Sequence, residues 1–219
     1  MDSAVEAIRG GDVLRLKELL GQDPGLATAR LDGQRTLLHV ATDWPGHFPR
    51  VVETVVILIE HGADVNAPFI GRHQETPLHW AASSDDVEVL DGLLDHGADI
   101  EARGGVIGGG TALSDAVAFG QWKAARRLVQ RGARASLWEA AALGMMAEVE
   151  TYFAGAATPA ADEITNAFWC ACHGGQRGTA EYLLARGADL NWVGHDGLTP
   201  IDAARRSKAY DVVAWLEGK

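Results

Sequence analysis

The chain has 219 residues, 47% of them hydrophobic and 22% charged, which is enough apolar material for a continuous core. Its formal net charge of −11, without a basic stripe, argues against nucleic acid as a partner. No apolar run approaches the ~20 residues of a membrane span, and residues 1–6 lack the features of a signal peptide. Cys170 and Cys172 are poorly placed for a mutual disulfide. We therefore expect a cytoplasmic protein without a membrane segment.

The first units of the chain are irregular. Residues 7–20 contain a Gly-Gly turn followed by two leucines and predict a degenerate first helix pair. Residues 36–41 then read TLLHVA. A second phrase, in which an apolar residue is followed by a Gly-Ala pair, closes that unit at Gly62. Between these phrases, residues 43–50 (DWPGHFPR) predict a loop inserted between two helices.

The clearest copy of the first phrase is TPLHWA at residues 76–81. Thr76 suits the cap of a helix and Pro77 its first position. Later copies read TALSDA at residues 111–116 and TPIDAA at residues 199–204. The closing phrase returns at Gly97, Gly132 and Gly187, where a helix end favours glycine.

These two phrases resemble the ankyrin-repeat family over the whole chain. The resemblance implies an all-α solenoid of stacked helix-turn-helix pairs with projecting hairpin loops, forming a single domain of residues 1–219. We count seven helix pairs, with an N-terminal cap repeat at about residues 3–30 and a C-terminal cap repeat at about residues 195–219. The core is expected to contain Leu78, Leu113, Leu137 and Phe168. In the last helix, residues 209–217, the expected inner stripe is Tyr210, Val213 and Trp215.

The chain departs from a plain array in its second half. Leu113 and Leu137 are closer together than the family period of ~33 residues, which predicts that one hairpin finger is missing. Trp138 and Trp169 stand where earlier repeats carry a histidine that, in the family, bonds to the neighbouring repeat. We expect these substitutions to remove that bond and to make room for a pocket.

The resemblance implies a concave binding surface formed by first helices and finger tips. The residues expected there are aromatic, acidic or small: Asp43, Trp44, His73, Glu75, Trp80, Ser83, Ser84, Phe119, Trp138, Trp169 and Cys170. This mixture predicts a module whose acidic, aromatic groove binds an unidentified protein or small organic ligand. A basic partner would complement such a groove.

An enzyme of the isomerase or cyclase type is the alternative. Asp115 and Glu139 are expected at equivalent, exposed groove positions of neighbouring repeats, within roughly 10 Å of each other. Two such carboxylates beside aromatic rings have their pKa values driven apart and suit acid–base roles. His173 three positions after Cys170 adds a weaker signal for a thiolate–imidazole pair. Nothing in the sequence predicts a metal site or a cofactor.

The segment 103–110 contains five glycines and precedes a predicted helix. It lacks the Gly-Lys-Ser/Thr ending of a nucleotide-binding loop. Two alternatives remain open, an anion-binding nest of backbone N–H groups and a mobile lid over the groove.

Overall fold

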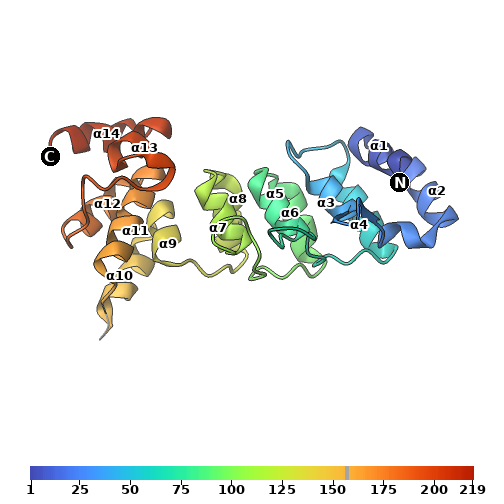
Figure 1. Ribbon diagram of the computed structural model, residues 1–219, viewed down its shortest axis with the longest axis horizontal. Coiled ribbons are helices and arrows are strands. Elements are labelled where there is room, and N and C mark those ends of the chain that lie inside the picture. Colours follow the sequence, from blue (N-terminus) through green and yellow to red (C-terminus); the bar gives the residue numbers. More distant parts are fainter. Residues whose placement is uncertain (156–157) are drawn as a thin grey trace. The chain divides into compact units, whose positions relative to one another are not determined.

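The computed structural model describes residues 1–155 and 158–219, and these residues form fourteen α-helices arranged as seven pairs (Figure 1). The all-α fold and the seven pairs are thus confirmed. The chain divides into two compact units, residues 1–133 (unit 1) and residues 134–219 (unit 2). The expectation of a single domain with terminal cap repeats stays a prediction. No helix in the described part of the chain is long and apolar enough to cross a bilayer.

Unit 1 contains four helix pairs. Their first and second members are α1 (Asp2–Gly10) and α2 (Val13–Gln22), α3 (Leu37–Thr42) and α4 (Val51–Glu60), α5 (Pro77–Ser83) and α6 (Val87–Asp95), and α7 (Ala112–Ala118) and α8 (Trp122–Gln130). First helices pack on first helices and second helices on second helices, which gives two layers. A short 3-10 helix, η1 (Pro24–Ala27), and two antiparallel strands, β1 (Arg30–Leu31) and β2 (Arg35–Thr36), lie between α2 and α3.

The repeated phrase marks where each first helix begins. At α3, the Thr36 backbone N–H donates to His39 Nδ1 at 3.2 Å, and Thr76 and His79 form the same capping box at α5. Because Nδ1 accepts, Nε2 carries the proton. His39 Nε2 donates to the Glu75 carbonyl at 3.0 Å, and His79 Nε2 donates to a carbonyl of the next repeat. Burial lowers the pKa of His39 to about 4. Both histidines therefore link repeats as neutral rings.

The loop of residues 43–50, called the Trp44 loop below, separates α3 from α4 as predicted. Neighbouring repeats brace it on both sides. A Cβ added at Gly11 would lie 2.5 Å from the Pro49 carbonyl oxygen, so Pro49 packs directly against the turn between α1 and α2. On the other side, the His47 N–H donates to Asp86 Oδ2 at 2.6 Å, and Asp86 also caps α6.

Unit 2 contains three helix pairs. They are α9 (Leu137–Leu143) and α10 (Met146–Ala154), α11 (Ala161–His173) and α12 (Arg177–Leu184), and α13 (Pro200–Arg206) and α14 (Tyr210–Glu217), with a 3-10 turn, η2 (His195–Gly197), before α13. Leu137 and Phe168 belong to one core cluster of this unit, and Leu78 and Leu113 are buried in unit 1. The four predicted core residues are confirmed as buried.

Two connections are too short for a hairpin finger. Only residues 131–136 separate α8 from α9, whereas residues 96–111 separate α6 from α7. This agrees with the predicted missing finger. Residues 155–160 form an equally short connection, which the sequence did not predict because α11 begins early, at Ala161, and keeps the repeat spacing near its usual value.

The inner stripe of the last helix is different from the prediction. Tyr210 is 73% exposed, whereas Val212 and Leu216 are buried. Val213 and Trp215 pack only partly against the core. Residues four apart lie on the same face of a helix, and in α14 the face that meets the core is the one that carries Val212 and Leu216.

Candidate functional site

Large apolar side chains are exposed at several points of unit 1. Trp44 is 79% exposed in its loop, and Phe119, the C-cap of α7, is 49% exposed. Ile70 and Ile107, which lie in the connections before α5 and α7, are 53% and 37% exposed. Single exposed apolar side chains are common on protein surfaces, so the degree of exposure of Trp44 is the feature that stands out among them. The predicted exposure of Trp44 and Phe119 agrees with the structure.

Trp80 forms an aromatic cluster with the connection before its own helix. Its ring centroid lies 5.9 Å from that of Phe69 and 5.0 Å from that of His39. Burial raises the pKa of Glu75, and a hydrogen bond with the Trp80 side chain partly offsets that rise. Phe69 is not among the predicted site residues, and its only signal in the sequence is its position as a large apolar residue in a polar finger.

Among the remaining polar candidates of unit 1, Asp43 and Ser84 have structural partners. Asp43 Oδ2 lies 3.2 Å from Arg35 Nη1 and 3.9 Å from Arg9 Nη2, so guanidinium groups largely balance its charge. The Ser84 hydroxyl, buried at the end of α5, donates to the Thr42 carbonyl at 3.4 Å. Ser83 and His73 are half-buried. These candidate residues therefore carry less uncompensated negative charge than the sequence predicts.

Asp115 is fully buried, so its predicted exposure is wrong. The segment 103–110, called the glycine loop below, covers it. The Ile107 N–H donates to Asp115 Oδ1 at 3.1 Å, and a Cβ added at Gly105 would lie 2.6 Å from Oδ2. Burial, with a smaller contribution from the charge of Glu75, raises the pKa of Asp115 to about 6.

Glu139 is also buried, and its predicted groove position is wrong by one residue. Ser136 caps α9, and Glu139 Oε2 accepts the Ser136 N–H at 2.7 Å and its hydroxyl at 2.6 Å. Glu139 therefore occupies the capping position that His79 has in α5. Trp138 accordingly takes the position of Leu78 and packs partly against the core of unit 2. Asp115 belongs to unit 1 and Glu139 to unit 2. Their predicted closeness therefore concerns a distance between the units and stays a prediction.

Trp169 keeps the link between repeats that its substitution was expected to remove. Its indole N–H donates to the Leu198 carbonyl at 2.8 Å, and Leu198 directly precedes the cap residue Thr199, as Glu75 precedes Thr76. The indole thus replaces the imidazole as donor. At 3% exposure, the ring is part of the core and offers little surface to a ligand.

Replacing Trp169 with phenylalanine should lower the free energy of unfolding by about 0.5–1.5 kcal/mol, because the Leu198 carbonyl loses the indole donor and keeps only the Gly194 N–H at 3.0 Å. Urea unfolding followed by circular dichroism measures the change. Trp192→Phe is the matched control, since the Trp192 ring also packs edge-on against His195 but is not the donor to the Leu198 carbonyl. Equal losses in the two variants would contradict a specific role for the indole bond.

The environment of Cys170 opposes a thiolate. The thiol is 4% exposed and lies 3.9 Å from Asn166 Oδ1, and burial raises its pKa far above the usual range. His173 Nδ1 lies 3.0 Å from the Ser207 hydroxyl oxygen. A nucleophilic pair requires a thiol that ionises near neutral pH. The structure therefore gives no support to catalysis by Cys170 with His173.

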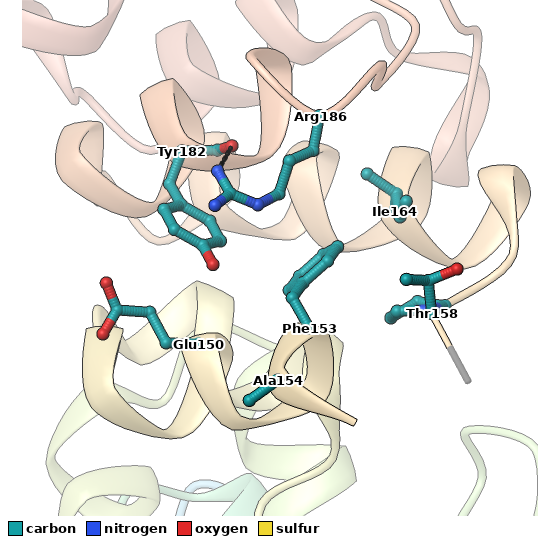
Figure 2. A pocket seen from close by; sticks show the side chains of 8 residues that line it. Glu150, Phe153, Ala154, Thr158, Ile164, Tyr182 and Arg186 are labelled. Carbon is teal, nitrogen blue, oxygen red and sulfur yellow. Dashed lines mark hydrogen bonds between the residues drawn. The ribbon is translucent and has the colours of Figure 1, made fainter. Parts of the chain in front are cut away.

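A pocket of about 590 Å³ lies in unit 2, next to α10, the start of α11 and α12 (Figure 2). Its lining residues are Glu150, Phe153, Ala154, Thr158, Pro159, Ile164, Tyr182 and Arg186. The Arg186 guanidinium carbon lies 3.3 Å from the Tyr182 ring centroid, a cation–π arrangement visible in Figure 2. None of the predicted site residues lines this pocket. The prediction concerns the first helices and the fingers, whereas half of the pocket's lining residues lie on the second helices α10 and α12.

Comparisons with known proteins agree with the geometry. Residues 4–104 match the family model of ankyrin repeats in three copies. An ankyrin repeat and KH domain-containing protein of Caenorhabditis briggsae is 30% identical over 181 residues, which are 78% of this chain and 7% of that protein. A dihydromonapterin reductase of Klebsiella pneumoniae is 29% identical over 105 residues, 44% of each chain. This chain thus spans less than half the length of either relative.

The crystal structure of the human ASB11 ankyrin repeat domain matches with a TM-score of 0.59 and 20% identity, covering 99% of this chain and 98% of that one. At 20% identity this match shows the fold alone. Together with the family match and the repeated capping phrase, it shows that the chain belongs to the ankyrin-repeat family. Ankyrin repeats indicate a protein-binding module.

Proposed function

We propose that unit 1 recognises a protein partner through the Trp44 loop and the neighbouring aromatic part of the groove. The observation that carries this proposal is the 79% exposure of Trp44 on a loop that contacts the repeats on both sides of it. Tryptophan is enriched among the residues that dominate binding energy at interfaces. A partner that covers this ring would bury a large apolar surface.

The bracing of the loop supports the same proposal. The contact between Gly11 and Pro49 fixes one side of the loop, and the hydrogen bond from His47 to Asp86 fixes the other. A loop that is already ordered loses little conformational entropy when it binds. Trp44 is therefore presented in a defined place, ready to enter an apolar pocket of the partner.

Charge and aromatic surface define the rest of the partner. Asp43 is paired and Asp115 is covered, so Glu75 beside Trp80 is the acidic group that remains on this surface. The net charge of −11 favours encounters with a partner that carries basic groups. We infer a protein partner with an apolar pocket and basic side chains around it. A small organic ligand in the same groove is the alternative.

A peptide library selected on the immobilised wild-type protein tests the proposal. For the selected peptides, Trp44→Ala should lower the affinity at least about 30-fold, the loss expected of a dominant interface residue. Titration calorimetry measures it. The stability of the variant should change by less than about 0.5 kcal/mol, because the side chain is exposed.

Leu14→Ala is the matched control, because Leu14 is 70% exposed on α2, a second helix of the same unit. Its affinity for the peptides should equal that of the wild type. Unchanged affinity in Trp44→Ala, or an equal loss in Leu14→Ala, would show that the partner binds elsewhere.

A further inference from the structure

The glycine loop lies closer to its neighbours than side chains would permit. A Cβ added at Gly104 would lie 2.4 Å from the Gln74 carbonyl oxygen, and one added at Gly105 would lie 2.6 Å from Asp115 Oδ2. The Gln74 N–H also donates to the Gly104 carbonyl at 3.0 Å. The loop is thus held down by the preceding finger, residues 61–76, and by the carboxyl group of α7.

The carboxyl group beneath the loop is incompletely satisfied. Asp115 Oδ1 accepts the Ile107 N–H, whereas Oδ2 is buried without a hydrogen-bond partner among the described residues. A buried carboxylate that lacks part of its solvation is costly, and protonation removes most of that cost. The closed loop therefore binds the neutral form of Asp115 more favourably than the ionised form.

We propose that the glycine loop is a proton-controlled lid, which stays down on Asp115 when this residue is protonated and opens when it ionises. Opening lets water reach the carboxylate and exposes the surface between the finger of residues 61–76 and α7. The glycines allow such a change, because they have few conformational restrictions. Ile107, at 37% exposure, gives the closed loop little apolar anchoring.

The charged and polar groups that face Asp115 set the pH at which the loop opens. Glu75, on the finger, raises the pKa of Asp115, whereas His73 on the same finger and the N–H groups of Val106 and Ile107 lower it. Burial is the largest effect and brings the value from 3.8 to about 6. In the open loop the carboxyl group returns towards its ordinary pKa.

The sign of the pH dependence follows from these two states. The closed state has the higher pKa, so its advantage is complete below the pKa of the open state and is lost as the pH rises through about 6. Each unit of difference between the pKa values of Asp115 in the closed and open states changes the ratio of closed to open loop by up to tenfold. The ratio should therefore fall by roughly tenfold or more between about pH 4.5 and 7.5.

Amide hydrogen exchange of Ile107, measured by NMR across this range and corrected for intrinsic rates, tests the proposal. In the wild type, protection should fall as the pH rises, whereas helix amides such as that of Ala116 should keep their protection. Asp115→Asn carries a neutral side chain that still accepts from Ile107, so its protection should be independent of pH. Glu75→Gln should move the wild-type midpoint to lower pH, since it removes a charge that raises the pKa.

Protection of Ile107 that does not vary with pH in the wild type would overturn the lid. So would an unchanged pH dependence in Asp115→Asn. If Asp115→Asn does not fold, the wild-type profile and the shift in Glu75→Gln decide the matter, and an unshifted midpoint in Glu75→Gln would then overturn the proposal. Parallel loss of protection at Ala116 would indicate unfolding of α7 instead of opening of the loop.

Discussion

Replacing Leu113 with alanine is expected to lower the free energy of unfolding by about 2–5 kcal/mol. Leu113 is fully buried on α7, which packs against α5 and α8. Removal of its isobutyl group loses the burial of the apolar atoms and leaves a cavity that a stack of short helices cannot close easily. Urea or thermal unfolding, followed by far-ultraviolet circular dichroism, measures the change.

Leu14→Ala is the control for this experiment as well. Leu14 has the same side chain in the same unit but is 70% exposed, so its loss should be within about 0.5 kcal/mol. A loss at Leu113 as small as that at Leu14 would mean that α7 does not pack as described. The contrast between the two leucines isolates burial from residue type.

Replacing Gly174 with alanine is expected to destabilise unit 2 by about 1–3 kcal/mol or more. A Cβ at this position would lie 1.9 Å from the Ala142 carbonyl oxygen at the end of α9. Because the obstacle is backbone, the two helices α9 and α11 must move apart to accept the methyl group. Thermal unfolding should show the loss directly.

Gly178→Ala is the matched control for Gly174→Ala. Gly178 lies within α12, and a Cβ there would meet only the flexible end of Met146 at 3.7 Å. This variant should be neutral or gain up to about 1 kcal/mol, since alanine favours the helix more than glycine does. Similar losses in both variants would argue against the close approach of α9 and α11.

The sequence predicted the repeats well because their signals are local. Thr36, Thr76 and Thr111 each cap a helix and precede a buried leucine, so the phrase reports the start of a helix and its inner face together. The same locality explains the error at Glu139. Aligning Leu137 with Leu78 places the cap at residue 135, whereas Ser136 is the cap, so α9 starts one residue later than that alignment implies.

The candidate site was harder to predict, because exposure depends on distant segments. Asp115 lies on the expected face of α7, yet the glycine loop folds back over it. Trp169 stands at a histidine position, yet its longer ring reaches the same kind of carbonyl. The exposure of Phe119 and of the Trp44 loop was recognisable in advance, and for the loop the reason is that an insertion between two short helices has to project from the stack.

The bonds from ring nitrogens give the array a direction. His39 and His79 each donate forward, to the carbonyl that precedes the cap of the following first helix, and Trp169 does the same in unit 2. A repeat of this kind therefore offers a ring N–H donor to the following repeat and a backbone carbonyl acceptor to the preceding one. In the last repeat Asp202 takes the ring position and bonds to Thr199 and Arg205 within its own helix and cap. A carboxylate at this position therefore stabilises the cap of its own helix, as Glu139 does at Ser136, and leaves the link between repeats to other groups.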